Sequence, residues 1–180
     1  MRAYQANLEL ENHTQVADLA RTLEIQFCSA EPGTVFLNGE DISKDIRTDL
    51  GSDLASLVGS IPEVREALHE RQLQFRKSPG LVADGRDMGT VVFPDATLKI
   101  FLTAIVSERA QRRYKQLIDK GIDANLPDLL RDLKERDKRD TERPVSPLNP
   151  AEDAVILDST DLTIEQVVEQ VLELFAAENS

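Results

Sequence analysis

The sequence predicts an α/β protein: a parallel sheet with flanking helices, and a small antiparallel β insertion in the first third of the chain. Short apolar runs alternate with helical patterns in the second half, as in the βα units of a parallel sheet. Two β-rich runs nearer the beginning flank Glu31-Pro32-Gly33, which is typical of an antiparallel hairpin. The 180 residues, 41% of them apolar, are enough for one domain with its own core, so a single domain over residues 1–180 is expected.

The first half of the chain combines helices with the β insertion. Apolar residues at helical spacing predict helices over Asn12–Leu23, Asp49–Val58 and Pro62–Lys77. Pro62 fits the first turn of its helix, where a missing N–H costs nothing. Strands are predicted over Glu24–Ser29 and Thr34–Asn38, with a continuation over Asp41–Arg47. Residues 24–48 therefore make up the insertion.

The second half alternates strands and helices. Three compact apolar runs predict strands covered on both faces: Leu81–Ala83, Leu98–Leu102 and Ala154–Asp158. Helices are predicted over Ser107–Lys120, closed by Gly121, over Pro127 to Glu142, and over Thr163–Glu178. The last helix opens with a Thr163/Gln166 capping box. Its apolar residues are expected to be buried: Ile164, Val167, Val168, Val171, Leu172 and Phe175.

Charge and composition exclude several classes of protein. A formal net charge of −12 argues against a broad nucleic-acid-binding surface. Residues 107–143 nevertheless hold eleven Lys/Arg and nine Asp/Glu, so one basic segment suits a small anionic ligand. No apolar run is long enough for a membrane helix and no signal pattern opens the chain, so a cytoplasmic protein is expected. A single cysteine, Cys28, agrees with a reducing compartment.

The segment Asp84–Thr90 follows a predicted strand at the edge of the sheet where ligands bind in open parallel sheets. Two glycines allow a tight turn and close approach to a ligand, and Arg86 offers a planar fork of donors suited to phosphate. Asp87 could accept a hydrogen bond from an amino group such as that of cytosine. A solvated turn with an internal Arg–Asp pair explains the same residues equally well.

Charged residues continue the apolar side of the helix that begins near Pro127. Helical spacing brings Arg136, Asp137, Asp140 and Arg143 onto that side. Two explanations of this charged side remain: its side chains contact a polar ligand, or they are simply solvated. Arg109, Arg112 and Arg113 on the preceding helix could likewise face phosphates or be ordinary surface residues. His13 and His69 have no ligand-spaced partners, so no metal site is predicted.

Taken together, these motifs resemble consecutive segments of bacterial cytidylate kinases. The most specific string is GLVADGRDMGTVVFPDA, at Gly80–Ala96, and its order relative to the other segments supports the match. The other matching segments are Ile46–Gln72, Lys99–Leu117 and Arg131–Thr160. The resemblance implies a P-loop kinase-like fold and transfer of the γ-phosphoryl group of ATP, with magnesium, to CMP or dCMP. It also implies a monomer that acts on nucleotides.

The resemblance carries site roles onto the matching positions of this chain. Ser56, Arg65 and Asp87 would read the cytosine. Arg86 and Arg143 would hold the acceptor phosphate, while Arg136 and Asp140 would reach the sugar or bridge toward the transferring group. The arginines that would meet ATP phosphates, flanking a lid region at residues 107–143, are Arg109, Arg112 and Arg113. Phosphoryl transfer depends on positioning and charge neutralisation, which arginines at both phosphates would supply.

The chain departs from the family pattern in one respect. The family has a first strand and a GxxxxGK[ST] loop, and these 180 residues contain no Gly-Lys-Ser or Gly-Lys-Thr. Impaired kinase activity is therefore expected, with a truncated gene product favoured over a pseudo-enzyme or a partner chain that supplies the loop. Two alternatives remain: a module that binds CMP without turnover, and an interaction protein whose acidic terminal helix docks on a basic partner.

Overall fold

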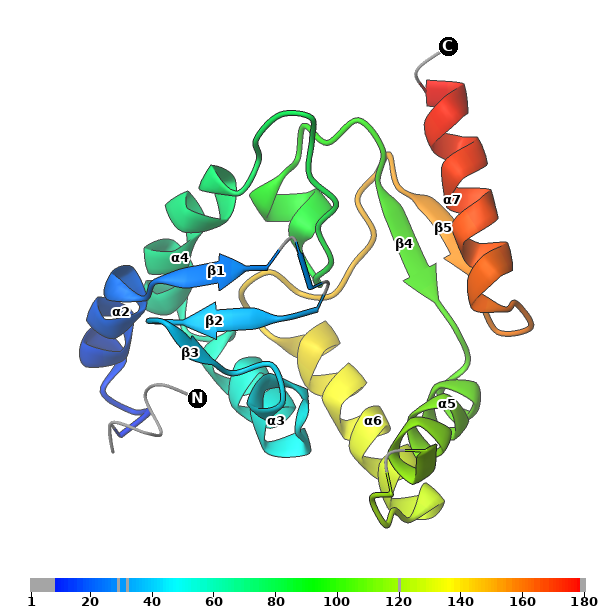
Figure 1. Ribbon diagram of the computed structural model, residues 1–180, viewed down its shortest axis with the longest axis horizontal. Coiled ribbons are helices and arrows are strands. Elements are labelled where there is room, and N and C mark those ends of the chain that lie inside the picture. Colours follow the sequence, from blue (N-terminus) through cyan, green and yellow to red (C-terminus); the bar gives the residue numbers. More distant parts are fainter. Residues whose placement is uncertain (1–8, 29, 32, 120, 179–180) are drawn as a thin grey trace. The chain divides into compact units, whose positions relative to one another are not determined.

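The computed structural model describes residues 9–28, 30–31, 33–119 and 121–178 (Figure 1). Ser29, Pro32 and Lys120, which belong to predicted elements, lie outside these ranges. The chain divides between Leu81 and Val82 into two compact units. The expectation of a single domain stays a prediction.

The described part of the first unit contains three α-helices whose predicted positions are confirmed. They are α2 (His13–Thr22), α3 (Asp49–Val58) and α4 (Pro62–Gln74). The side chains of Asn12 and Thr48 cap α2 and α3 by accepting hydrogen bonds from backbone N–H groups of the first turn. Helix α4 ends three residues before the predicted Lys77.

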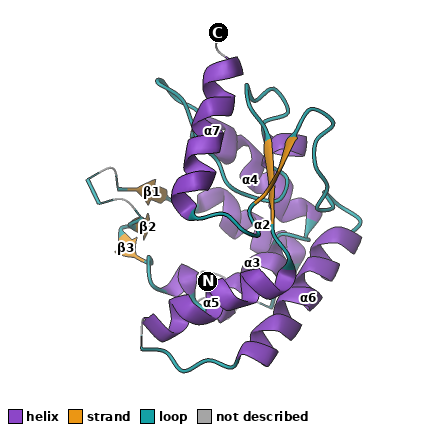
Figure 2. Cartoon of the chain, turned by 90° about the vertical axis from the view of Figure 1, so that its right-hand side faces the viewer, coloured by secondary structure: helices purple, strands orange, loops and turns teal. Residues whose placement is uncertain are grey.

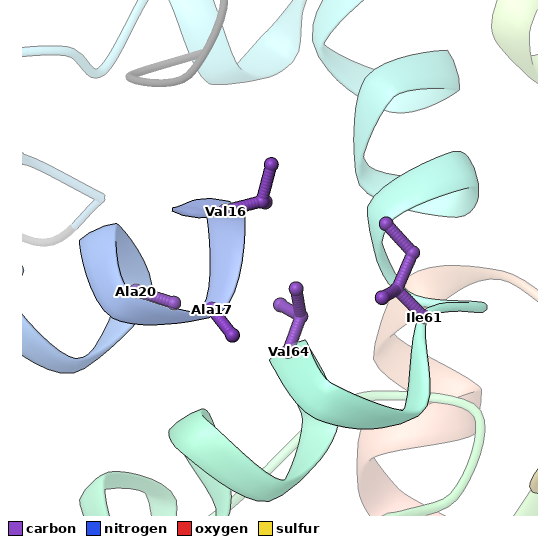
Figure 3. Packing of buried hydrophobic residues seen from close by; sticks show 5 residues of the cluster. All are labelled: Val16, Ala17, Ala20, Ile61 and Val64. Atoms are coloured by element: carbon purple, nitrogen blue, oxygen red, sulfur yellow. The ribbon is translucent and has the colours of Figure 1, made fainter. Parts of the chain in front are cut away.

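The core of the first unit lies where α2 packs on the start of α4. Val16, Ala17 and Ala20 on α2 contact Ile61 and Val64, and all five side chains are buried (Figure 3). The two alanines let the helices approach closely, while the branched side chains fill the space between them. Helical spacing of small and branched residues therefore explains this packing.

The β insertion forms the predicted antiparallel sheet, whose strands run across the view in Figure 1 and are seen end-on in Figure 2. Its order is β1 (Ile25–Phe27), β2 (Val35–Leu37) and β3 (Glu40–Asp41), with Ile25 opposite Leu37 and Phe36 opposite Asp41. Val35, Leu37 and Ile42 form its buried cluster. The predicted continuation over Asp41–Arg47 is wrong beyond Asp41, because the chain turns there and forms a short 3₁₀ helix, η1 (Asp45–Arg47).

The second unit contains the predicted parallel pairing. Strand β4 (Ile100–Thr103) pairs with β5 (Val155–Asp158), with Ile100 opposite Val155 and Thr103 opposite Asp158. Between them the chain forms α5 (Val106–Asp119) and α6 (Leu126–Glu142), which pack side by side (Figures 1 and 2). Gly121, with a φ of 71°, ends α5: its N–H and that of Ile122 donate to the carbonyls of Ile118 and Leu117.

Two further predictions are wrong. Leu81–Ala83, at the boundary between the units, forms no strand, because this short run has no ladder partner among the described residues, and Val82 is 100% exposed. The terminal helix α7 (Ile164–Glu178) forms as predicted, but none of its residues is buried. Among the described residues, no helix is both long enough and apolar enough to cross a membrane.

Candidate functional site

The Asp84–Thr90 segment leads into a π-helical turn, η2 (Met88–Val92). The carbonyl of Asp87 accepts hydrogen bonds from the N–H groups of Val91 and Val92, at 2.9 and 3.2 Å. A Cβ atom on Gly85 would lie 2.9 Å from Cγ of Met88, so a glycine allows the Met88 side chain to fold over the backbone here. The turn leaves Asp87 only 7% exposed, and Val92 and Phe93 are buried behind it.

A buried carboxylate organises the charged end of α6. Asp140 is 1% exposed and forms an ion pair with Nε of Arg86. Nε of Arg136, one turn earlier on α6, lies 3.8 Å from the same carboxylate oxygen. The structure therefore joins a loop arginine to the last turns of a helix 50 residues further along the chain.

Arg143 completes this group of charges at the end of α6. It is the C-terminal cap, in extended conformation, and its Nε donates to the carbonyl of Ser146 at 2.6 Å. Its Nη2 atom is buried and has no hydrogen-bond partner among the described residues. Burial lowers the pKa of Arg143 and the Arg86 guanidinium lowers it further, while Asp140 raises it. An anion placed beside this guanidinium would relieve both unfavourable effects.

Together, Arg86, Arg136, Asp140 and Arg143 form what we call the arginine cluster. Three guanidinium groups surround one carboxylate, so two positive charges remain uncompensated within the cluster. Guanidinium groups bind phosphate oxygens in a planar, two-point geometry. The cluster can therefore bind a phosphate monoester, which carries nearly two negative charges at neutral pH.

Arg109 links α5 to α6. Its Nη1 donates to Oδ1 of Asp137 at 3.0 Å, Nη2 pairs with the other oxygen, and Nε donates to the carbonyl of Ala104 at 3.1 Å. The hydrogen bonds that Arg109 donates to the Asp137 carboxylate raise the pKa of Arg109 above its ordinary value. Asp137 thus faces a different arginine from Asp140, although both lie on the predicted charged side of α6.

Arg112 holds the loop after β5. Its Nη2 donates to the carbonyls of Ser159, Thr160 and Leu162 at 2.5, 3.2 and 3.4 Å, and its Nε pairs with Glu108. Ser159 is 4% exposed and donates through Oγ to the carbonyl of Thr103 at the end of β4. Arg113, the third of these arginines, is half-buried on α5.

Ser159 and Thr160 received no role from the sequence, although they follow β5 at its carboxyl end. Thr160 donates through its N–H and hydroxyl to Oδ1 of Asp158 and accepts from the N–H of Ile105 at 3.0 Å. Their position in the sequence could have identified them as candidate site residues, because polar residues directly after a parallel strand lie at the edge of the sheet where ligands bind.

Two predicted site residues belong to the first unit. Ser56 lies on α3, and Arg65 on α4 donates through Nη1 to the carbonyl of Gly59 at 3.0 Å. The remaining predicted site residues all belong to the second unit. Within that unit, the structure brings Arg86, Arg136, Asp140 and Arg143 together and places Arg109 in a separate ion pair.

Comparisons with known proteins agree with this arrangement of motifs. A family model described as cytidylate kinase matches residues 1–177. The cytidylate kinase of Pseudomonas entomophila is 55% identical over 167 residues, covering 91% of this chain and 73% of that protein. The cytidylate kinases of Cupriavidus necator and Bordetella bronchiseptica are each 54% identical, covering 96% and 98% of this chain and 77% and 78% of their own lengths.

Proposed function

Because the chain belongs to the cytidylate kinase family, we propose that it acts on nucleotides by transferring the γ-phosphoryl group of ATP to CMP or dCMP. The family and the names of its relatives indicate a phosphotransferase of this kind. The oligomeric state and location stay predictions: a monomer in the cytoplasm.

The observation that supports the acceptor site most strongly is the Nη2 atom of Arg143, which is buried and has no hydrogen-bond partner among the residues that the structure describes. A buried donor without a partner costs about 1–3 kcal/mol, so the site gains most from a ligand that supplies an acceptor oxygen. We assign the acceptor phosphate to Arg86 and Arg143. Arg136 and Asp140 are assigned to the sugar, or to a bridge toward the transferring phosphoryl group.

Base recognition is assigned to Ser56, Arg65 and Asp87. Asp87 supports this role by chemistry, since a carboxylate accepts hydrogen bonds from the exocyclic amino group that distinguishes cytosine from uracil. Its low exposure, 7%, would make such a hydrogen bond strong and selective.

The donor side is assigned to Arg109, Arg112 and Arg113, which would contact ATP phosphates. Arg109 and Arg112 are engaged with Asp137 and with the loop after β5, so a phosphate would compete with these protein acceptors. Magnesium enters as part of the substrate MgATP. In the described part of the chain, no three His, Cys, Asp or Glu side chains gather closely enough to hold a metal ion, so we assign no residue to magnesium.

We further propose that turnover by this chain is impaired. The 180 residues contain no Gly-Lys-Ser or Gly-Lys-Thr, so the loop of backbone N–H groups, lysine and hydroxyl that normally holds ATP phosphates has no counterpart in the sequence. The same observation favours the alternative function, a module that binds CMP without phosphorylating it.

Calorimetric titration with CMP, run beside a coupled assay containing ATP, magnesium and CMP, separates these functions. CMP binding with slow turnover supports an impaired kinase, and CMP binding with no turnover supports the binding module. Rapid turnover would overturn the proposed impairment. A folded chain that binds neither CMP nor dCMP would overturn the acceptor assignments.

A further inference from the structure

Lys99, the residue directly before β4, carries a nearly buried ammonium group to which the sequence assigned no role. Its side chain is only 8% exposed, and its Nζ donates to the carbonyl of Pro94 and to Oδ2 of Asp153, both at 2.6 Å. Its own carbonyl accepts from the N–H of Val155, at the start of β5, at 2.9 Å. Lysine is almost never buried unless it is paired, so its burial at this position needs a specific reason.

The Lys99 side chain contacts both ends of the η2 turn. At the beginning of the turn its aliphatic stem packs on Gly89, where a Cβ atom would lie 3.3 Å from both Cγ and Cδ of Lys99. Beyond the end of the turn its ammonium group donates to the carbonyl of Pro94. One side chain therefore spans the turn and fixes the separation of its two ends. We call Lys99, with its contacts to Gly89, Pro94 and Asp153, the Lys99 brace.

The η2 turn determines the position of Asp87, the residue directly before it. The carbonyl of Asp87 accepts hydrogen bonds from the N–H groups of Val91 and Val92, so its backbone is fixed by the closure of the turn. A recognition group has to be held within about 0.5 Å of its productive geometry. Any loosening of η2 would therefore change the direction of the Asp87 carboxylate.

Asp153 connects the brace to the sheet, because it precedes β5 by two residues. Its side chain is 65% exposed, and the hydrogen bond from Lys99 lowers its pKa. An ion pair with such an exposed carboxylate contributes little to stability. An apolar side chain of similar length would fill the space of Lys99 at least as well. Stability alone therefore does not explain a lysine here, whereas fixing the η2 turn does.

We propose that Lys99 is a positioning residue for base recognition: by bracing η2 between Gly89 and Pro94, it holds the Asp87 carboxylate in the direction that selects cytosine over uracil. This inference rests on the proposed function, in which Asp87 accepts from the exocyclic amino group of cytosine. Uracil presents a carbonyl oxygen at that position, which a fixed carboxylate repels. A carboxylate that can turn away from this oxygen tolerates both bases.

Calorimetric titrations with CMP and with UMP test the proposal. The variant Lys99→Met keeps an apolar stem of similar length and removes the ammonium group. It should lower the preference for CMP, measured as the ratio of the UMP and CMP Kd values, by about three- to tenfold, the scale of one hydrogen bond. A merely structural role would weaken the binding of both nucleotides by the same factor and leave this ratio unchanged. The matched control is Lys134→Met, which changes an exposed lysine of α6 and should keep the ratio of the unaltered chain.

A second variant disturbs the brace without removing its charge. Gly89→Ala keeps the ammonium group and both of its acceptors, but its methyl group lies 3.3 Å from the Lys99 stem and forces the stem or the turn to shift. The preference for CMP should fall in this variant as well. Circular dichroism establishes that each variant is folded.

Two measurements without nucleotide report on the brace itself. In the Lys99→Met variant, NMR titration should show the Asp153 pKa rising toward its ordinary value, since its principal hydrogen bond is lost. Hydrogen exchange at the N–H groups of Val91 and Val92 should become faster, because both donate to the carbonyl of Asp87 within the braced turn. Neither change is expected in the Lys134→Met variant.

The outcomes separate this inference from the proposed function. If the unaltered chain prefers CMP, an unchanged preference in Lys99→Met and Gly89→Ala overturns the inference and leaves the proposed function intact. An equal loss of CMP and UMP binding does the same. If the unaltered chain binds both nucleotides equally well, base selection by Asp87 is wrong and the inference fails, while phosphate binding by the arginine cluster stands. A folded chain that binds neither nucleotide overturns both the proposed function and the inference.

Discussion

The guanidinium group of Arg86 forms an ion pair with the carboxylate of Asp140, which is 1% exposed. This contact joins the loop before η2 to the end of α6, two segments that are 54 residues apart. A buried carboxylate surrounded by arginines holds their planes in fixed positions before any ligand arrives.

Asp140→Asn should destabilise the protein. The substitution removes the charge that compensates Arg86 and Arg136 while keeping the size of the side chain. Removing one partner of a buried pair costs several kcal/mol, and because the Arg86 side chain is 36% exposed we expect a smaller loss, about 1–3 kcal/mol in the free energy of unfolding. Urea denaturation measures it. Asp132→Asn, at an exposed position of the same helix, should cost less than about 0.5 kcal/mol. Equal losses would show that Asp140 contributes nothing special.

Arg143→Ala should weaken CMP binding. If Arg143 donates to the acceptor phosphate, its loss removes a charge-assisted hydrogen bond worth about 1.5–3 kcal/mol, which corresponds to a roughly 10- to 150-fold higher Kd. Calorimetric titration with CMP provides the measurement. Arg131→Ala removes an exposed arginine of α6 and serves as the control, with an unchanged Kd expected. A CMP affinity in the Arg143 variant that matches the control contradicts the phosphate assignment.

The ion pair between Arg109 and Asp137 should stabilise the packing of α5 on α6. Both side chains are about one-third exposed, so solvent screens part of the interaction and we expect a coupling energy of about 1 kcal/mol, above that of a fully exposed pair. A double-mutant cycle with Arg109→Ala and Asp137→Ala isolates this term. The exposed pair Arg131–Asp128 supplies the control cycle. A coupling no larger than that of the control would contradict a structural role for Arg109.

Thr160→Val should raise the pKa of Asp158 toward its ordinary value. The hydroxyl and the N–H of Thr160 donate to the Asp158 carboxylate, and the hydroxyl is the larger cause of its lowered pKa. A group whose pKa is lowered by folding stabilises the native state above its unfolded-state pKa, and that contribution disappears as the pH falls through the folded-state pKa. The stability difference between the unaltered chain and the variant should therefore shrink below about pH 4.

NMR titration of the Asp158 carboxyl group measures this pKa directly. Thr160→Ser keeps the hydroxyl donor and should leave the pKa lowered, which makes it the matched control. An Asp158 pKa that stays equally low in the valine variant would mean that backbone donors alone account for the shift.

Local patterns predicted most elements of this fold. The spacing of Val16 and Ala20 identified α2, and the Thr163/Gln166 capping box forms as expected, with the Thr163 N–H donating to Gln166 at 2.9 Å. These features depend on interactions within a few residues, so the sequence carries them directly. Helical spacing likewise brought Arg136 and Asp140 together on α6, and the structure confirms that they face one another.

Contacts between distant segments were not predictable in this way. The sequence placed Asp137 and Asp140 on one charged side, but only the tertiary structure shows that Asp137 pairs with Arg109 on α5 and Asp140 with Arg86. The partner of a charged side chain depends on which helix packs against it, and residue spacing carries no information about that. The predicted strand at Leu81–Ala83 failed for a related reason, since an apolar run becomes a strand only when another strand accepts its hydrogen bonds.

The sequence by itself therefore determined the family of the chain, the identity of the residues in the arginine cluster and the helical or extended character of most segments. The tertiary structure decided which of those residues meet, that Nη2 of Arg143 is buried without a hydrogen-bond partner in the described part of the chain, and that Ile164, Val168 and Leu172 lie exposed. Periodicity reports which side of a helix is apolar because side chains repeat with the helix itself. Whether that side is covered depends on elements far away in the chain or in another molecule, and only the folded structure reports it.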